Sequence, residues 1–478
     1  MSISTVAHDP SARYAGTSPR FAQGGDLCLK EYPVPDSTLV NSDLQSALDE
    51  ARQAYLARNP KSFSRHQEAC EAMPGGNTRT TLHNSPFPLT VVRGEGCRLW
   101  DADGHEYIDV LGEYTAGIYG HSHPVIRAAI DRALNHGWNY GGRNANEARL
   151  AKLIADRMPS IDLVRFTNSG TEGNVMALAG ARVYAQRMGR IGATKVMVFH
   201  GGYHGGVLYF VSGGSPVNVP YDYIVAPYND IEGTRALFSK HGGEIFAVLL
   251  EPMQGSHGCL PGDLDFLKMV REETRSHGIT MIFDEVMTSR LAPGGLQEKT
   301  GVIPDMTTLG KYIGGGMSFG AFGGRRDIME LFDPTRPDHL PHAGTFNNNA
   351  LTMAAGAAGY GEVYTPAAAK ELNERGEKIR QRLNAICQRE KVAFQFSGIG
   401  SMMTAHATAQ PVRTAADIAS SNQDAKELFF FDMMAAGIWI ARRGFVALNI
   451  MIGDAEGDRF VAAVEEFVTA RKALLQPK

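Results

Sequence analysis

Short apolar runs alternate with stretches of helical periodicity between residues 160 and 285, and this alternation limits the possible fold more than any other feature. A continuous apolar run indicates a strand that is buried on both faces, as in a parallel sheet covered by helices. Ligands bind such sheets at the carboxyl ends of the strands. We therefore expect an α/β fold whose functional residues follow the predicted strands at 163–166, 195–199, 224–227, 247–250 and 281–283.

Composition narrows the partners that this chain can bind. Lys and Arg number 47 against 51 Asp and Glu, and a net charge of -4 predicts no nucleic-acid surface. No apolar run approaches the ~18 residues of a membrane-spanning helix, so we expect no membrane partner. The N-terminus lacks the charged-then-apolar order of a signal peptide, although a transit peptide remains an alternative. Five scattered cysteines without a C-x-x-C pair suit a reducing compartment, and we expect a cytoplasmic protein.

The first polar cluster, T-N-S-G-T-E-G at 167–173, lies between a predicted strand and a predicted helix. Ser169, Gly170 and Thr171 would present backbone N–H groups and hydroxyls at the N-terminus of that helix. Such a terminus suits an anion, phosphate above all. Ser and Thr are equally common as ordinary helix caps, so this cluster by itself leaves both interpretations open.

Asp284 directly follows the apolar run 281–283. Burying a carboxylate at a strand end is costly unless a cation pairs with it. A protonated pyridinium nitrogen would be such a cation, and an ordinary helix cap is the alternative role for Asp284.

Lys311 lies in T-L-G-K-Y-I-G-G-G, between Gly310 and three further glycines. A lysine in a crowded, glycine-lined loop can lose its proton and form a Schiff base with a carbonyl compound. A phosphate-binding P-loop is excluded, because position 305 is Asp and Tyr312 follows the lysine.

Tyr203 lies in H-G-G-Y-H-G-G, where the neighbouring glycines would let its ring stack on a planar ligand. A packed tyrosine in an ordinary glycine loop is the alternative. His121 and His123, in G-H-S-H-P, have no third ligand at a fitting spacing, so we predict no metal site. The chain contains neither G-x-S-x-G nor H-E-x-x-H, which removes the common serine hydrolase and zinc protease signatures.

Together these clusters describe a site for pyridoxal 5'-phosphate (PLP). They comprise a phosphate cup, a ring-stacking residue, an acid for the ring nitrogen and a lysine for the aldehyde, at successive predicted strand ends. We accordingly expect four parts in the chain. Residues 1–45 form a poorly ordered N-terminal extension, and residues 46–120 form a segment with a helix and a small meander that packs on the small domain. Residues 121–348 form a large PLP-binding domain, and residues 349–478 form a small C-terminal α+β domain.

The motifs G-H-S-H-P, N-S-G-T-E, G-G-Y-H-G, D-E-V, T-L-G-K and G-T-F-N-N-N resemble those of class III aminotransferases. These are fold-type I PLP enzymes, which include ω-transaminases and glutamate-1-semialdehyde aminomutase. The resemblance covers most of residues 70–470. Within the family, M-P-G-G-N-T-R and R-R-G-F-V-A-L are similar to motifs of bacterial enzymes that act on aromatic β-amino acids.

The resemblance implies roles for individual residues. Lys311 would hold the cofactor and move the proton, and Asp284 would keep the ring nitrogen protonated. Thr345, in G-T-F-N-N-N, would reach the phosphate of a partner subunit, which implies a homodimer with shared active sites. Ser169, Gly170 and Thr171 would bind the phosphate. Tyr203 would cover one face of the ring, and Val286 with Met287 would lie on the other. Arg79 and Arg443 would bind the substrate carboxylates, with Arg442 an alternative to Arg443.

The resulting hypothesis is an aminotransferase with a small-molecule amino donor and a keto-acid acceptor. The amino group of a β-amino acid similar to 3-amino-3-phenylpropanoate would pass to 2-oxoglutarate or pyruvate by a ping-pong mechanism. A glutamate-1-semialdehyde 2,1-aminomutase and an ω-amine transaminase are the alternatives. The intact Lys311 disfavours a non-catalytic relative.

Overall fold

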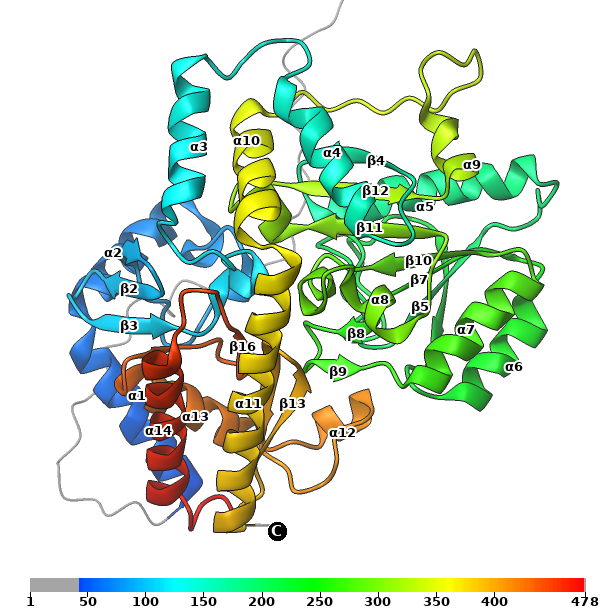
Figure 1. The fold of residues 1–478 in the computed structure, drawn as a ribbon. Helices are drawn as coiled ribbons and strands as arrows, with labels where there is room; N and C mark the ends of the chain where they lie inside the picture. The colour runs from blue at the N-terminus through cyan, green and yellow to red at the C-terminus, as the bar shows by residue number, and fades with distance from the viewer. Residues whose placement is uncertain (1–42, 477–478) are drawn as a thin grey trace, which may run out of the picture.

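The computed structural model describes residues 43–476, and within them the largest sheet has seven strands (Figure 1). One strand, the second in spatial order, runs antiparallel to both of its neighbours, and all the other adjacent pairs of strands are parallel. The sheet is thus mostly parallel, as predicted. In spatial order its strands are β4 (Leu163–Thr167), β12 (Gly320–Gly324), β11 (Met306–Gly310), β10 (Thr280–Asp284), β7 (Ile245–Leu250), β5 (Lys195–Phe199) and β6 (Asp222–Ala226).

Helices cover both faces of this sheet, and the side chains of β10 alternate between them. Ile282 joins the apolar core beneath α5, whereas Met281 and Phe283 join the core beneath α7. All three side chains have no exposed surface. The helices of this part of the chain are α4 (Ala145–Arg157), α5 (Gly170–Arg187), α6 (Ile231–His241), α7 (Leu264–Ser276), α8 (Gly295–Thr300) and α9 (Arg326–Met329).

All five predicted strands are confirmed, but sequence reasoning missed β11 and β12. Strand β12 has the sequence G-A-F-G-G, which resembles a loop more than a strand. Its glycines are required by close packing, because a Cβ on Gly320 would lie 2.0 Å from the backbone oxygen of Ser169. Because close packing requires glycines in β12, this strand lacks the apolar pattern by which the sequence reveals the other strands.

The helical spacing of Leu44, Leu48 and Ala51 predicts one helix over residues 43–72, but the structure has two, α1 (Leu44–Arg58) and α2 (Pro60–Ala72). The prediction was wrong at Pro60, whose ring occupies the site of a helix N–H and disfavours helical geometry at Asn59. The Asn59 backbone has φ -125° and ψ 48°. Residues 1–42 of the predicted extension lie outside the described residues.

The predicted meander is confirmed as β1 (Val91–Glu95), β2 (Arg98–Asp101) and β3 (Glu106–Asp109). Strand β3 also pairs in parallel with β15 (Ile438–Trp439), so this sheet joins two segments that lie far apart in sequence. Helix α1 likewise packs on α13 (Gln423–Ala435). Proline is common in the first turn of a helix, so Pro124 predicts a helix start, which is confirmed in α3 (Pro124–Asn135).

The C-terminal part combines helices with a three-stranded sheet, in agreement with the predicted α+β character (Figure 1). Two of its helices, α11 and α14, run side by side and pack on each other. The elements are α10 (Ala350–Ala358), α11 (Pro366–Glu390), β13 (Gln395–Ile399), β14 (Met402–His406), α12 (Ala415–Ala419), α13, β15, β16 (Phe445–Ala447) and α14 (Asp454–Ala470). The division of the chain into four parts stays a prediction.

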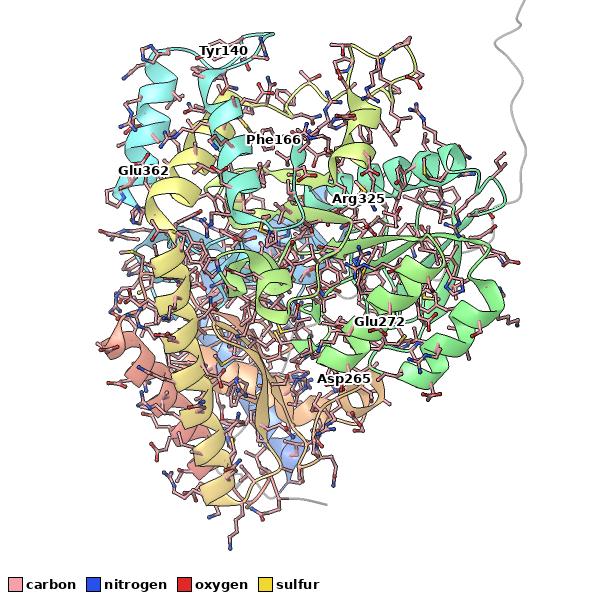
Figure 2. All side chains as sticks on the ribbon, turned by 45° about the vertical axis from the view of Figure 1, so that its right-hand side comes forward. Tyr140, Phe166, Asp265, Glu272, Arg325 and Glu362 are labelled. Carbon is pink, nitrogen blue, oxygen red and sulfur yellow. The ribbon has the colours of Figure 1, made fainter. Side chains whose placement is uncertain are left out.

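Exposed aromatic side chains gather on two loops that touch each other. Tyr140 lies at the outer edge of the molecule, on the loop between α3 and α4 (Figure 2). The side chains of Trp138, Tyr140 and Phe346 are 47%, 48% and 60% exposed. The loop that carries Phe346 contacts the loop between α3 and α4, because Asn348 of the former donates a hydrogen bond to the carbonyl of Gly142 in the latter. In residues 43–476, no helix has both the length and the apolar character that a bilayer crossing requires.

Candidate active site

The predicted site residues lie at or just after the carboxyl ends of four strands of the seven-stranded sheet. Ser169 follows β4, Tyr203 follows β5, Asp284 is the last residue of β10 and Lys311 is the first residue after β11. Because β10 and β11 are adjacent and parallel, their carboxyl ends bring Asp284 and Lys311 to the same edge of the sheet. This edge is where α/β proteins bind their ligands.

Asp284 is 4% exposed, and three donors hold its carboxylate. Oδ2 accepts hydrogen bonds from Asn174 Nδ2 at 2.8 Å and His204 Nδ1 at 2.9 Å, and Oδ1 accepts one from the backbone N–H of Val286 at 3.0 Å. Thr308 fixes the Asn174 amide by donating its hydroxyl to Oδ1 over 2.7 Å. The carboxylate is therefore held in one orientation at the strand end, where a ring nitrogen could meet it.

Glu251 is a further buried carboxylate behind the site. Its Oε2 accepts from the backbone N–H of Tyr203 at 2.9 Å, and its Oε1 accepts from that of Gly255 at 3.1 Å. Burial raises the pKa of Glu251 to about 7. The residue fixes the start of the loop that carries Tyr203 and His204, so it positions two side chains of the site.

Lys311 is partly buried and has a left-handed backbone, with φ 54°. A non-glycine residue in this region is strained and is held there by its surroundings. Burial lowers the pKa of the Lys311 amine to about 8, with the charge of Asp284 acting in the opposite direction. The amine is therefore closer to its neutral, nucleophilic form at physiological pH than an ordinary lysine.

The N-terminus of α5 forms a cradle that only glycines permit. Ser169 caps the helix, its hydroxyl accepting from the N–H of Glu172, and the first-turn N–H groups at Gly170 and Thr171 have no intrahelical acceptor. A Cβ on Gly170 would lie 2.7 Å from the side chain of Val286. A Cβ on Gly205, whose φ is 118°, would lie 2.1 Å from the hydroxyl of Thr171.

This cradle fits the phosphate of PLP, since it combines free helical N–H groups with hydroxyls and a close backbone. The neighbouring residues fit the rest of the cofactor. Val286 contacts the cradle at Gly170 and Gly310, and Tyr203 packs edge-on against the ring of Tyr209 at 5.9 Å. The lysine and the acid lie at the ends of two adjacent strands, and the anion cradle lies beside them, because Gly310 is close to the backbone of Gly170.

A pocket of about 580 Å³ opens in front of Lys311. Its lining combines aromatic and cationic side chains. It includes Tyr114, Tyr203, Tyr209, Met287, Arg79, Lys311, Lys426, Arg442 and Arg443, together with Glu427. A pocket with this lining suits a substrate that carries both an apolar group and a carboxylate.

The three arginines of the pocket differ in their partners. Arg79 forms an ion pair with Glu113, and Arg442 Nη2 pairs with Glu427 Oε2 at 2.5 Å. Arg443 forms no ion pair with any residue in the described part of the chain, and its guanidinium lies over the ring of Tyr114 at 5.0 Å. Arg443 is therefore the arginine whose charge is available to a ligand.

Thr345 does not line this pocket. It lies on an exposed loop, outside the group formed by Lys311, Asp284 and Tyr203. The two histidines of G-H-S-H-P also lie elsewhere: His121 contacts Asp109 at 2.9 Å and His123 directly precedes α3. Within residues 43–476, no three His, Cys, Asp or Glu side chains gather in a way that would hold a metal ion.

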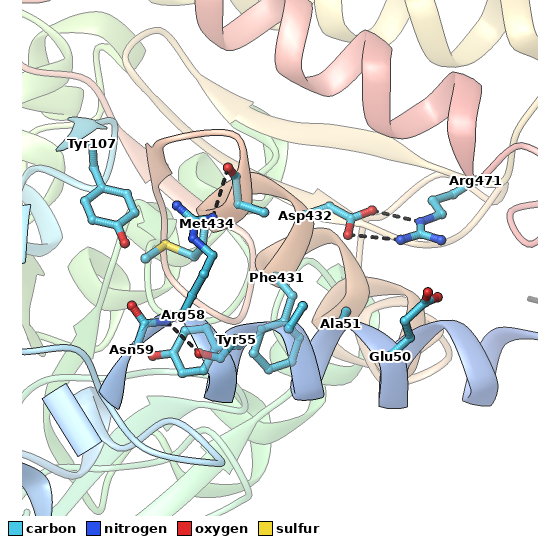
Figure 3. A pocket seen from close by; sticks show the side chains of 12 residues that line it. Glu50, Ala51, Tyr55, Arg58, Asn59, Tyr107, Phe431, Asp432, Met434 and Arg471 are labelled. Carbon is cyan, nitrogen blue, oxygen red and sulfur yellow. Dashed lines mark hydrogen bonds and ion pairs between the residues drawn. The ribbon is translucent and has the colours of Figure 1, made fainter. Parts of the chain in front are cut away.

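A second pocket, of about 330 Å³, lies between α1 and α13 (Figure 3). Its ionic groups interact mainly with each other and with the backbone. Asp432 pairs with Arg471 at 2.9 Å, and Arg58 donates to the carbonyl of Ala435 at 3.2 Å. It contains none of the predicted site residues, so the chemistry of the molecule is assigned to the pocket at Lys311.

Sequence reasoning missed His204, Asn174, Glu251 and Lys426. His204 directly follows Tyr203 in a motif that was recognised, so its position was a usable signal. Asn174 and Asp284 are 110 residues apart, and Glu251 and Tyr203 are 48 apart. No local pattern in the sequence could reveal these pairs.

Comparisons with known proteins agree with this geometry. The family model for class-III aminotransferases matches residues 80–465. The β-phenylalanine transaminase of Variovorax paradoxus is 51% identical over 437 residues, which cover 91% of this chain and 99% of that protein. A glutamate-1-semialdehyde 2,1-aminomutase of Sorangium cellulosum is 36% identical, over 87% of this chain and 98% of that protein.

A similar fold occurs in a solved structure of β-phenylalanine aminotransferase from Variovorax paradoxus. The TM-score is 0.88 and the identity 51%, and the match covers 91% of this chain and 99% of the solved one. The likeness therefore extends over most of the chain.

Proposed function

Since this chain belongs to the class-III aminotransferase family, we propose that it moves the amino group of an aromatic β-amino acid to a keto acid. The chain is a PLP-dependent aminotransferase with the fold-type I architecture. When bound, PLP supplies an electron sink for the carbanion that deprotonation of the substrate creates. The donor that we propose resembles 3-amino-3-phenylpropanoate, and the acceptor is 2-oxoglutarate or pyruvate, in a ping-pong cycle.

The observation that carries this proposal is the pairing of Arg443 with aromatic rings in one pocket. The Arg443 guanidinium lies 5.0 Å from the ring of Tyr114 and 5.3 Å from that of Phe445. Arg79 lies over the same Tyr114 ring at 5.7 Å. A β-amino acid with an aromatic substituent needs a carboxylate anchor and an aromatic wall, and this pocket provides both.

We assign the chemistry to groups whose positions suit it. Lys311 Nζ binds the cofactor and then carries the proton between the substrate carbon and the cofactor. Asp284, held by Asn174 and His204, keeps the ring nitrogen protonated. An amine of lowered pKa suits the lysine's role, because it accepts and releases a proton near neutral pH.

Other residues bind the cofactor without moving protons. Ser169, Gly170 and Thr171 bind the phosphate, Tyr203 covers one face of the ring, and Val286 with Met287 lies on the other face. The side chains on the two faces of the ring would also keep water away from Lys311.

The active unit that we propose is a homodimer with shared sites. Thr345 is exposed and lies on the loop that carries Phe346, beside the loop of Trp138 and Tyr140. Exposed aromatic side chains that gather on one surface are typical of a protein interface. Burying this surface against a second copy would bring Thr345 to the partner's phosphate site. The cytoplasmic location stays a prediction.

Absorbance spectra of the purified holoenzyme with single donors test the function. An aminotransferase given 3-amino-3-phenylpropanoate without acceptor converts its cofactor fully to the amine form and releases one keto acid per site. An aminomutase returns the amino group to the same skeleton and releases no keto acid. Conversion by simple aromatic amines but not by the β-amino acid would support the ω-amine transaminase instead.

A further inference from the structure

Lys426 is a buried lysine in the active-site pocket that neither the proposed mechanism nor the motifs explain. It lies in the first turns of α13 and its side chain is 5% exposed. It lines the same pocket as Lys311 and Arg443. Over residues 43–476, the Lys426 amine makes no hydrogen bond or ion pair. A buried ammonium group without a partner is costly, so it needs an explanation.

No neighbouring group supplies the missing negative charge. Glu427, the next residue, is fully used: Oε1 accepts from Arg52 at 3.0 Å and Oε2 pairs with Arg442 at 2.5 Å. His257 and His406 are also close enough to feel the charge of Lys426, and burial lowers the pKa of each to about 4. Both imidazoles are therefore neutral at pH 7 and bring no negative charge.

The remaining charged neighbour, Arg443, is positive. Burial, aided by Arg443, lowers the pKa of Lys426 to about 8, so the amine is still mostly protonated at pH 7. Helix α13 adds to the positive potential, because it begins at Gln423, which also lines the pocket, and its N-terminus points there. The pocket thus holds two cations, Lys426 and Arg443, that lack counter-ions in the described part of the chain.

Two unpaired cations in one pocket match a ligand with two carboxylates. We propose that Lys426 forms a second anion subsite, which binds the distal carboxylate of a dicarboxylic keto acid while Arg443 binds the carboxylate beside the keto group. The residue would then select acceptors of the 2-oxoglutarate class over pyruvate. A β-amino acid donor with a single carboxylate would not use it. This inference rests on the proposed aminotransferase function and narrows its acceptor.

Binding of unreactive analogues to the holoenzyme tests the subsite directly. Glutarate has two carboxylates and butyrate has one, and neither has a keto group to react. Calorimetry should show that wild-type protein binds glutarate at least tenfold more tightly than butyrate. In Lys426→Met the affinity for glutarate should fall about tenfold to a hundredfold, since a hydrogen bond to a charged group is lost. The affinity for butyrate should change much less.

Two variants complete the test. Lys426→Arg keeps the charge and should retain most of the preference for glutarate. Lys240→Met removes an exposed lysine of α6 and serves as the control for a change in net charge. In the acceptor half-reaction, Lys426→Met should lower the ratio of kcat/KM for 2-oxoglutarate to that for pyruvate by the same tenfold to hundredfold.

Several results would overturn the proposal. Equal affinity of the wild type for glutarate and butyrate would do so whether or not any variant folds. An equal loss of both ligands in Lys426→Met would place the lysine at the shared carboxylate instead. The donor half-reaction with 3-amino-3-phenylpropanoate is read separately: if it fails while glutarate binds as expected, the proposed donor is wrong and the subsite stands.

Discussion

The imidazole of His204 donates a hydrogen bond from Nδ1 to Oδ2 of Asp284 over 2.9 Å, and both side chains are almost fully buried. The carboxylate accepts protons but donates none, so this contact fixes the imidazole as the donor at Nδ1. His204 therefore sets the direction of the carboxylate that we propose for the ring nitrogen of the cofactor. A group that works through another residue in this way is a positioning residue, and its loss is expected to be milder than that of Asp284.

The first prediction concerns Asp284→Asn. The amide keeps the shape of the side chain but removes the charge that holds the proton on the ring nitrogen. We expect the variant to bind PLP and to lose about a hundredfold or more of its kcat. His204→Gln should cost less and shift the cofactor absorbance. Turnover of the Asn variant at the wild-type rate would remove Asp284 from this role.

The second prediction concerns Lys311→Ala. Without the amine, the cofactor has no covalent link, so dialysis should remove it from the variant but not from the wild type. Amino transfer should fall below detection. A variant that still completes the full cycle at the wild-type rate would contradict the assignment.

The lowered pKa of Lys311 gives a third prediction, on pH dependence. The neutral amine attacks the aldehyde, so the rate at which apoprotein forms its covalent link with added PLP should rise with pH. The midpoint should lie at about 8, the pKa of Lys311, and not near the ~10.4 of an ordinary lysine. Stopped-flow absorbance on apoprotein measures this rate. A rate that still rises in proportion to hydroxide between pH 9 and 10 would contradict the lowered pKa.

The fourth prediction compares two adjacent arginines. Arg443→Ala should weaken the binding of carboxylate-bearing substrates by on the order of 2–5 kcal/mol, because the charge of the ligand is left unpaired. Simple aromatic amines, which have no carboxylate, should suffer much less. Arg442→Lys is the matched control, since it keeps a positive charge beside Glu427. Half-reactions measured with a β-amino acid, an amine and each keto acid separate these effects. Equal losses for all substrates would make Arg443 structural.

The fifth prediction concerns shared sites. Lys311→Ala and Thr345→Ala chains are each expected to be impaired, and mixing them should form hybrid dimers with one site that carries both native residues. Activity recovered after subunit exchange would support sites built from two chains. Sedimentation that finds a fully active monomer would exclude this arrangement.

Much of the sheet could be predicted from the sequence, because buried parallel strands carry continuous apolar runs such as Ile245–Leu250. Strand β12 could not, since its glycines reflect the close approach of Ser169 and not its own burial pattern. The break between α1 and α2 follows from Pro60, which the helical spacing of Leu44, Leu48 and Ala51 alone does not reveal.

The residues of the candidate site also differ in whether the sequence could reveal them. Residues that act in local motifs, such as Lys311 beside its glycines, could be named from the sequence. Residues whose role depends on a distant partner could not. Lys426 has no motif, and its significance arises from burial and from the fact that Glu427 is already paired. The choice between Arg442 and Arg443 likewise needed the partners of each side chain.

Glu427 also connects helix α1 to the pocket at Lys311, because it accepts a hydrogen bond from Arg52 of α1 and forms an ion pair with Arg442 at the pocket wall. This connection limits how the chain can be shortened in biocatalyst engineering. A truncation that ends before residue 43 leaves the connection intact, whereas one that removes α1 deprives Glu427 of one of its two counter-charges. The freed carboxylate would then compete with the keto acid for the pocket's cations, so we expect the loss of α1 to weaken keto-acid binding.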